Sequence, residues 1–495
     1  MIPIRTLRGI AATLAAIVAV PALLAAQIAP AEYAARREAL LARIDSGAVV
    51  AFGEVEPVRH WPPFEQLPSF EYLTGFHEPN AVLLLVKRGG AASARLFLVP
   101  RNRGMERFVG ARTGPDEAQA RTGIAGRPMA ELRAAVDSLA ASGLPLYLVA
   151  DVHTAENAEE DSLTRGASFV RSLRGARPGL VVMNGADEAL AQLRARKSPA
   201  EAALLRRAAE ISAAGHRDAM RAMAPGCTEG EIQAVLEGAF RRLGGERPGY
   251  GSIVGSGPNA LALHYDRNDR TLRAGEVVVI DAATSLGHYS ADVTRTLPVT
   301  GRFTPDQRAI YQIVLDAQAA YVRQVRPGGT EQAASDSGQA VVAAGLARLG
   351  LIESPGATFD GPGRCANGCP QVYLYTWHGF GGHGIGLEVH DPAQYYDAPN
   401  VFRPGDVTTV EPGVYVDPTI FDGLPDTPRN RAMIARLRPV MQRYPNLGVR
   451  IEDDYLITDT GVELLSGGVP RDPDAVEALM AQPSPPLPGG GQCGA

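Results

Sequence analysis

The sequence contains little cysteine: four residues in 495, and none before Cys227. The lack of an early cysteine excludes an N-terminal lipid-modified cysteine. Cys365 and Cys369 share a Gly/Pro-rich loop and could close a small local ring, but two cysteines cannot make a structural zinc site. The partners of Cys227 and Cys493 stay open.

The chain also lacks an excess of positive charge. Its net charge is −6 and its pI about 5.9, which argues against nucleic acid as the main partner. Beyond the N-terminus, no segment is apolar enough to span a bilayer. The composition, 45% hydrophobic and 21% charged, is that of a globular protein. Because 495 residues exceed one ordinary core, we expect two domains.

The N-terminus has the layout of a secretory signal peptide. Arg5 and Arg8 precede an uncharged run from Ile10 to Ala26, and cleavage is expected near Ala26 or Ala31. Residues 1–26 are therefore predicted to be removed, leaving a secreted or periplasmic protein without stable membrane insertion. An uncleaved membrane anchor is the alternative, for which the run is slightly short.

Two domains and a tail are predicted beyond residue 26. Residues 27–196 are expected to form a mixed α/β domain, with helices at Ala31–Asp45 and Met129–Ala140 and strands at Val49–Phe52, Ala81–Val86, Leu96–Val99 and Leu146–Val149. Residues 197–481 form the second domain, and the Pro/Gly-rich residues 482–495 are expected to be disordered.

The second domain opens with clear helix starts. Ser198-Pro199-Ala200-Glu201 combines an N-cap, a proline at the first helical position and a capping-box glutamate, and predicts a helix to about Met223. Thr228 and Glu231 begin the next helix, which Gly244 ends. In the first domain, Tyr72–Phe76 could belong to the core or form a lid; core packing is the simpler interpretation.

The second domain also contains a weak internal repeat. Leu272–Asp281 aligns with Phe402–Glu411 at an offset of 130 residues, and an acid ends each strand-like run. Pro225–Thr228 is echoed by Pro327–Thr330 at an offset of 102, and each opens a helix. Two related half-domains would face each other and point both acids inward.

Asp281 ends a strand-like run, Val277–Ile280, where a core strand should not place a charge. If the chain reverses at Leu286-Gly287, Asp292 pairs directly with Asp281 across a hairpin. Opposed residues hold their Cβ atoms roughly 4.5–5.5 Å apart, and like charges there repel. Such acids need a proton or a cation, and two metal ions about 3.5–4 Å apart fit that geometry. Two stray acids in a solvated loop are the alternative.

Further acids and histidines stand where a core should be apolar. His383 and His390 are seven residues apart, so a straight strand would place them on opposite faces. If both serve one site, the chain bends between them, most simply at Gly386. Glu411 and Glu452 each follow a strand-like run.

These residues resemble the pita-bread metallopeptidase family, whose five metal ligands match, in order and context, Asp281, Asp292, His383, Glu411 and Glu452. Within that family, YLTGFHEPNAVLLL and KSPAEAALLRRAAEI are typical of the aminopeptidase P and prolidase group, so the resemblance covers nearly the whole mature chain. It implies an α+β fold: a pita-bread catalytic domain with internal pseudo-symmetry, preceded by a smaller mixed α/β domain of the creatinase type.

The resemblance implies a dinuclear-metal Xaa-Pro aminopeptidase acting on peptides with proline at the second position, in a homo-oligomer. Asp292 and Glu452 would bridge the two ions, Asp281 would hold one, and His383 and Glu411 the other. This oxygen-rich set suits Mn²⁺.

Roles in catalysis follow from the same resemblance. Glu411 would act as the general base, while His390 and His264 donate to the substrate carbonyl and the oxyanion. Arg450 would orient a ligand carboxylate. His378 is expected near the substrate or behind the ligands, but the family spacing His-Gly-x-x-His carries one more residue here.

Other functions stay open at this point. A prolidase restricted to Xaa-Pro dipeptides is the alternative enzyme, and a metal-free pita-bread binding module is the alternative from another class. Export and the large N-terminal domain argue against a methionine aminopeptidase, and a creatinase-like group lacks the full ligand set. Residues 417–448, with a predicted helix at Arg429–Tyr444, look like an insertion.

Overall fold

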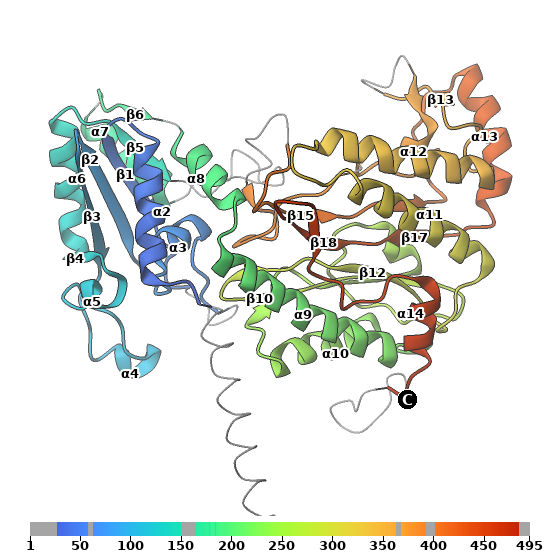
Figure 1. The fold of residues 1–495 in the computed structure, drawn as a ribbon, viewed down its shortest axis with the longest axis horizontal. Coiled ribbons are helices and arrows are strands. Elements are labelled where there is room, and N and C mark those ends of the chain that lie inside the picture. Colours follow the sequence, from blue (N-terminus) through green and yellow to red (C-terminus); the bar gives the residue numbers. More distant parts are fainter. Residues whose placement is uncertain are drawn as a thin grey trace, which may run out of the picture. The chain divides into compact units, whose positions relative to one another are not determined.

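The structure is a computed structural model that describes residues 27–57, 63–149, 165–177, 179–183, 185–362, 368–379, 381–392 and 401–484. Its chain forms two compact units (Figure 1). The N-terminal unit holds Gln27–Ala195 and the short segment that follows His390; the C-terminal unit holds Arg196–His390 and residues 401–484. The predicted signal peptide and nearly all of the predicted tail lie outside the described residues. Among the described helices, none combines the length and apolar character needed to cross a membrane.

A six-stranded mixed sheet organises the N-terminal unit, in the order β4-β3-β2-β1-β5-β6. The central strand β1 is buried along its whole length because both faces are covered. Its strands are β1 (Gly47–Phe52), β2 (Val82–Arg88), β3 (Ala91–Leu98), β4 (Ala125–Pro128), β5 (Leu146–Val149) and β6 (Val182–Met183). Its helices are α2 (Pro30–Ala42), α3 (Pro68–Thr74), α4 (Glu106–Val109), α5 (Ala118–Thr122), α6 (Leu132–Ala141), α7 (Arg165–Ala176) and α8 (Ala186–Ala195).

The predicted strands and helices of this unit are confirmed, while the short strands β4 and β6 were missed because each offers too few residues for a pattern. Tyr72 and Leu73 lie on α3 and are buried, which supports core packing over a lid. A buried ion pair, Arg194 Nη2 to Asp391 Oδ1 at 2.7 Å, holds the segment after His390 within the unit.

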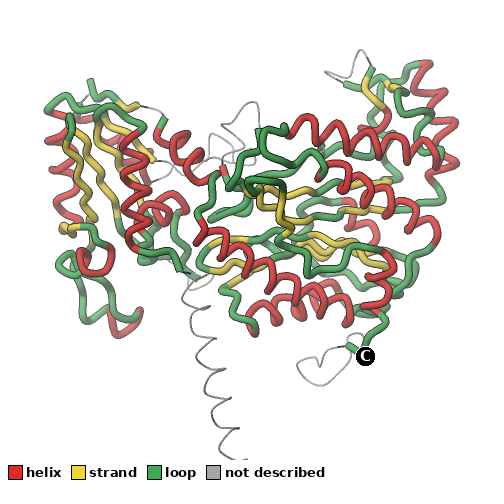
Figure 2. Tube along the Cα trace, viewed as in Figure 1, coloured by secondary structure: helices red, strands yellow, loops and turns green. Residues whose placement is uncertain are grey.

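Small sheets between two helix pairs make up the C-terminal unit, as Figures 1 and 2 show. The pair α9–α10 lies on one side of the strands and the pair α11–α12 on the other. The helices are α9 (Pro199–Ala222), α10 (Glu229–Arg242), α11 (Pro305–Val322), α12 (Glu331–Leu349), α13 (Pro428–Met441) and α14 (Pro473–Met480).

Its strands form sheets in the orders β12-β9-β8, β11-β10-β7, β15-β18-β19, β16-β17 and β13-β14. Their bounds are β7 (Arg247–Pro248), β8 (Ile253–Ser256), β9 (Val277–Asp281), β10 (Thr284–Leu286), β11 (Tyr289–Ser290), β12 (Thr294–Pro298), β13 (Thr358–Phe359), β14 (Cys369–Pro370), β15 (Val407–Val410), β16 (Gly413–Val416), β17 (Leu447–Arg450), β18 (Asp453–Ile457) and β19 (Val462–Leu464).

The helix starts follow the sequence. Ser198 and Thr228 both form complete capping boxes, so α9 and α10 begin where predicted. Cys227 and Cys369 are both disulfide-bonded. The local ring expected between Cys365 and Cys369 involves Cys365, which lies outside the described residues.

The predicted internal repeat is confirmed in the backbone hydrogen bonds. An isolated bridge joins Thr228 to Thr271 in the first half, and Thr330 to Val401 in the second. The offsets between these partners are again 102 and 130 residues. Two further bonds obey the same offsets, Gly226 N to Leu272 O at 3.0 Å and Gly328 N to Phe402 O at 2.9 Å. The two halves therefore share one local construction.

The predicted pairing of Asp281 with Asp292 is wrong by two residues. The tight turn is Gly287-His288, where both residues have positive φ, so Asp281 pairs with Thr294 instead. Because side chains alternate with period 2, a shift of two keeps both acids on one face of the hairpin. The register was wrong, but the two acids still lie close together and still need a proton or a cation.

Arg295 and Asp453 form a buried link between the halves, and both side chains are fully inaccessible. All five N–H groups of Arg295 donate: Nε to Pro470 O, Nη1 to Thr294 O and Glu452 O, and Nη2 to Asp453 Oδ1 and Val469 O. Such complete satisfaction is what makes a buried ion pair tolerable. The link fixes the main chain on both sides of the site described below.

The suspected insertion packs as part of the unit. Met433 and Leu437 of α13 are buried, and exposed arginines on the helix and just after its end pair with the rest of the fold. Arg429 lies 2.7 Å from Asp360, and Arg443 lies 2.6 Å from Asp306. These pairings fasten α13 to the segment before β14 and to the start of α11.

Candidate metal centre

Three side chains from distant parts of the sequence converge in the C-terminal unit. Asp292, His383 and Glu452 each place a ligand atom within 4.8 Å of the others, in a geometry that could hold a metal ion. Asp292 precedes β12, Glu452 stands between β17 and β18, and His383 lies in the Gly-rich stretch beside β15. Both acids are buried, with Asp292 4% and Glu452 1% exposed.

The two other predicted ligands adjoin this group. His383 Nε2 lies 3.3 Å from Glu411 Oε1 and 3.5 Å from Asp292 Oδ2. Asp281 is joined to Asp292 by the hydroxyl of Tyr250, which lies 2.6 Å from an oxygen of each. The structure thus brings all five predicted ligands together.

Donors behind the ligands fix their orientation. Arg450 donates through Nη2 to Asp281 Oδ2 and through Nη1 to the Tyr415 hydroxyl, 3.1 Å away. Thr294 Oγ1 donates to Glu452 Oε2 at 2.6 Å. The expected place of Arg450, behind a ligand carboxylate, is therefore where the structure puts it.

Glycines shape the stretch that carries the histidines. A Cβ on Gly382 would lie 1.8 Å from Thr409 O, so only glycine lets His383 pair with β15. The close approach at Gly382 is thus to the backbone of β15. The predicted bend occurs at Gly386, whose N–H donates to Glu388 O.

The remaining predicted histidines flank the ligands. The bend brings the ring centroids of His383 and His390 to within 4.3 Å of each other. The ring centroid of His264 lies 6.3 Å from that of His390. His378 packs edge-on against Tyr415, with ring centroids 5.0 Å apart. Within the described residues neither ring nitrogen of His378 has a partner, and burial lowers its pKa to about 4. Phe380, which lies within the lengthened spacing, is outside the described residues.

Electrostatics at the centre are unfavourable without a cation. Burial, reinforced by the charge of Asp281, raises the pKa of Asp292 well above its usual range. Burial and the charge of Asp292 do the same for Glu452. Burial alone would lower the pKa of His383, but the hydrogen bond and charge of Glu411 raise it to about 9. Correspondingly, although burial opposes it, contact with His383 lowers the pKa of Glu411.

The donor set fits divalent metal ions. Glu452 Oε1 is buried and lacks a hydrogen-bond partner among the described residues, so it has an unused lone pair facing the other acids. Four carboxylates and one imidazole make an oxygen-rich site. The charges of two divalent ions would balance those of the four carboxylates.

Two contributors were missed at the sequence level. Tyr250 stands between two glycines in a loop, a context without periodicity, so nothing marked it. Asp454 is buried and accepts the N–H of Asp292 at 3.0 Å. A signal for Asp454 existed, because two acids, Asp453 and Asp454, begin a strand whose other residues are apolar or aromatic.

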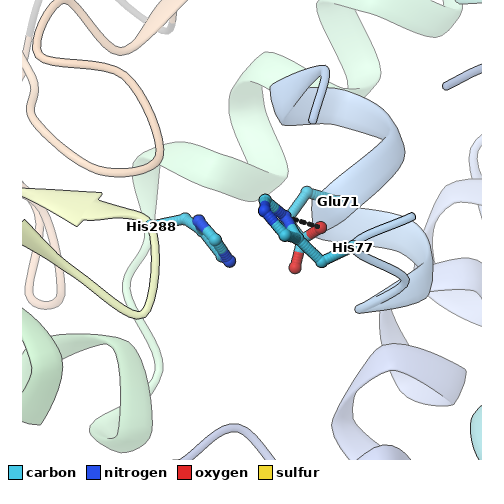
Figure 3. A group of neighbouring side chains, drawn as sticks. All are labelled: Glu71, His77 and His288. Carbon is cyan, nitrogen blue, oxygen red and sulfur yellow. Dashed lines mark ion pairs between the residues drawn. The ribbon is translucent and has the colours of Figure 1, made fainter. Parts of the chain in front are cut away.

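Another acid–histidine pair belongs to the N-terminal unit. Figure 3 draws Glu71 on α3 with His77, whose Nδ1 lies 3.7 Å from Glu71 Oε2. Glu71 is buried and His77 is 37% exposed. Neither residue belongs to the predicted ligand set.

Comparison with known families decides the relationship. The chain matches the model of metallopeptidase family M24 over residues 203–459, just over half its length. The chain belongs to metallopeptidase family M24. Residues 33–147 match the N-terminal domain of aminopeptidase P, so the family resemblance of both parts is confirmed.

Relatives in family M24 align over nearly the whole chain. Xaa-Pro aminopeptidases of Escherichia coli and Haemophilus influenzae are 34% and 33% identical, covering 92% and 91% of this chain and 98% and 97% of their own. The aminopeptidase PepP of Pseudomonas aeruginosa is 32% identical with a TM-score of 0.75, covering 92% of this chain and 99% of its own. A zinc-substituted aminopeptidase P of Escherichia coli with bound product is 32% identical with a TM-score of 0.74, covering 92% and 98%. The predicted α+β fold is therefore confirmed.

Tyr250→Phe tests the hydroxyl between the two acids. Removing it leaves Asp281 and Asp292 without their shared donor, so protons compete better with metal. We expect metal affinity to fall at least about 10-fold, the usual effect of losing a group that orients a ligand. Titration calorimetry with Mn²⁺ measures it, with Tyr444→Phe as control because the Tyr444 hydroxyl bonds to no described residue. Equal affinities for the two variants would contradict this role.

The raised pKa of His383 predicts the pH dependence of the metal-free protein. A folded pKa of about 9 against 6.5 unfolded gives stability that is complete below pH 6.5 and lost as pH rises to 9. Metal affinity should rise over the same window, because the bound imidazole must first release its proton. Thermal unfolding with and without metal at several pH values measures both trends. A pH trend that is unchanged in His383→Gln would contradict the assignment.

Proposed function

We propose that this chain is a dinuclear-metal Xaa-Pro aminopeptidase. The observation that carries the proposal is the convergence of Asp292, His383 and Glu452 within 4.8 Å, with Asp281 and Glu411 beside them. Relatives that are 33–34% identical over 97–98% of their own length carry the name Xaa-Pro aminopeptidase. A glutamate-to-alanine variant of the Escherichia coli aminopeptidase P has been seen in complex with substrate.

The predicted ligands form one proposed metal centre. Asp281, Asp292, His383, Glu411 and Glu452 would together hold two ions. Bound ions lower the pKa of water and polarise a carbonyl. We propose Mn²⁺ because carboxylates dominate the set and no thiolate is present, which suits hard, oxygen-preferring ions.

The protein side chains handle protons and charge. Glu411, 24% exposed and the most accessible of the four acids, takes a proton and delivers it to the leaving nitrogen. The ring of His390 lies next to that of His383, and the ring of His264 lies near that of His390. From these positions His390 and His264 donate to the substrate carbonyl and to the oxyanion.

Proline explains why such a site is useful. An Xaa-Pro bond has no N–H and a fixed φ, so proteases that read an extended backbone handle it poorly. A site that holds the substrate by its free N-terminus and polarises the carbonyl does not need that N–H. This is the substrate class that the relatives' names give.

Peptide cleavage tests the proposal. Protein loaded with Mn²⁺ should release the first residue of Xaa-Pro-Yaa peptides and leave matched Xaa-Ala-Yaa peptides intact. Glu411→Gln should lower kcat at least about 100-fold, as loss of a general base does. Glu463→Gln, at a half-exposed glutamate paired with Arg206, is the control and should retain activity. Metal content is measured in both variants.

Other outcomes point elsewhere. Cleavage of Gly-Pro without cleavage of longer Xaa-Pro peptides would make the chain a prolidase. Purified protein that binds no metal and hydrolyses nothing would be a binding module. Either result contradicts the proposal.

Export is the proposed route to a secreted or periplasmic location. Arg5, Arg8 and the following uncharged run support it, and the disulfide bonds of Cys227 and Cys369 fit an oxidising compartment. Intact mass of the protein made in a bacterial host should show a mature N-terminus near residue 27 or 32. A retained N-terminus would indicate the membrane-anchored alternative.

A further inference from the structure

Glu229, outside the metal centre, is a completely buried acid. It occupies the first turn of α10, where the helix dipole favours a negative charge. Its carboxylate is one of the most heavily hydrogen-bonded in the C-terminal unit. It accepts from five donors: Ser256 N and Oγ at 2.7 Å, Asn259 Nδ2 at 3.0 Å, the Tyr265 hydroxyl at 2.8 Å and Arg270 N at 2.9 Å.

All of these donors belong to one segment, residues 256–270. The segment leaves β8 through a short 3₁₀ turn, Gly257–Leu261, and its last residues have no helix or strand. Asn268 adopts a left-handed conformation at φ 47° and bonds to Ser252 O and Val254 N, which fixes the far end. Glu229 therefore holds the start, the middle and the end of the segment at one point.

His264 stands in the middle of this segment. It is exposed while the next residue, Tyr265, is half-buried, so the two side chains point to opposite sides. Tyr265 faces Glu229, and His264 faces His390, with ring centroids 6.3 Å apart. The Tyr265 hydroxyl also lies 3.1 Å from Asp269 Oδ1, within the same segment.

We propose that Tyr265, bonded to Glu229, is a positioning residue that holds His264 in place to donate to the reacting substrate. The inference rests on the proposed function and deepens it. Misplacing a donor by about 1 Å can cost roughly 100-fold in rate, so a single anchor next to the histidine matters.

The hydrogen bond from Tyr265 to Glu229 is suited to a permanent structural role. Burial and the bond to Glu229 raise the pKa of Tyr265 to about 12, so the hydroxyl stays a donor at any pH where the enzyme works. Tyr265→Phe removes the hydroxyl's bonds to Glu229 and Asp269, while Glu229 keeps its bonds to Ser256, Asn259 and Arg270. We therefore expect the Tyr265→Phe variant to fold.

A double-mutant cycle tests the proposal with Tyr265→Phe, His264→Ala and the double variant. Tyr265→Phe should lower kcat at least about 10-fold with metal content unchanged, and should cost nothing further once His264 is gone. Tyr311→Phe is the matched control, because it removes an equally short bond, 2.8 Å to Arg471 O, far from this segment in the chain. An equal loss of kcat in the wild-type and His264→Ala backgrounds would overturn the proposal.

Hydrogen exchange gives a readout that needs no substrate. Backbone amides of residues 261–271 should exchange faster in Tyr265→Phe and unchanged in Tyr311→Phe. Unaltered exchange in Tyr265→Phe would overturn the proposal even if the enzyme proves inactive on Xaa-Pro peptides. If the wild-type protein is inactive but Tyr265→Phe exchanges faster, the proposed function is contradicted and the positioning role of Tyr265 is supported.

Discussion

Mutual repulsion of acids is the constraint on which this structure depends. Asp281, Asp292 and Glu452 are at least nine-tenths buried, and Glu411 touches the same imidazole as Asp292. Buried like charges at such distances cannot all stay ionised unless positive charge is supplied. The protein supplies part of it through Arg450 and His383, while burial and mutual repulsion raise the pKa values of Asp292 and Glu452. Divalent ions would supply further positive charge.

Two similar half-domains carry this strained group. Asp281 ends β9 in the first half and Glu411 follows β15 in the second, at the same offset of 130 residues that relates Thr271 to Val401. Arg295 then binds the halves together, since its five N–H groups reach main-chain or side-chain oxygens of both. Because removing one partner of a buried pair costs about 3–5 kcal/mol, this link resists displacement of the ligands. The carboxylates therefore stay close together despite their mutual repulsion, and a bound metal ion would relieve that repulsion.

Much of this could be read from the sequence, and the misses have physical causes. Acids at strand ends, helix caps at Ser198 and Thr228, and the repeat were visible because each breaks or sets a local pattern. The hairpin register was not predicted correctly, because the turn includes His288 with a positive φ. A residue other than glycine rarely adopts that conformation, so the sequence did not indicate the turn. Tyr250 and Tyr265 escaped because their roles depend on hydroxyls meeting acids 42 and 36 residues away. Contacts of that range follow from packing and leave no local trace.

The most direct test of the central claim is anomalous scattering from crystals grown with Mn²⁺. Two peaks about 3.5–4 Å apart should lie between Asp292 and Glu452, one beside Asp281 and the other beside His383 and Glu411. Ordered crystals with no peak among these five side chains, or with the metal bound elsewhere, would contradict the account.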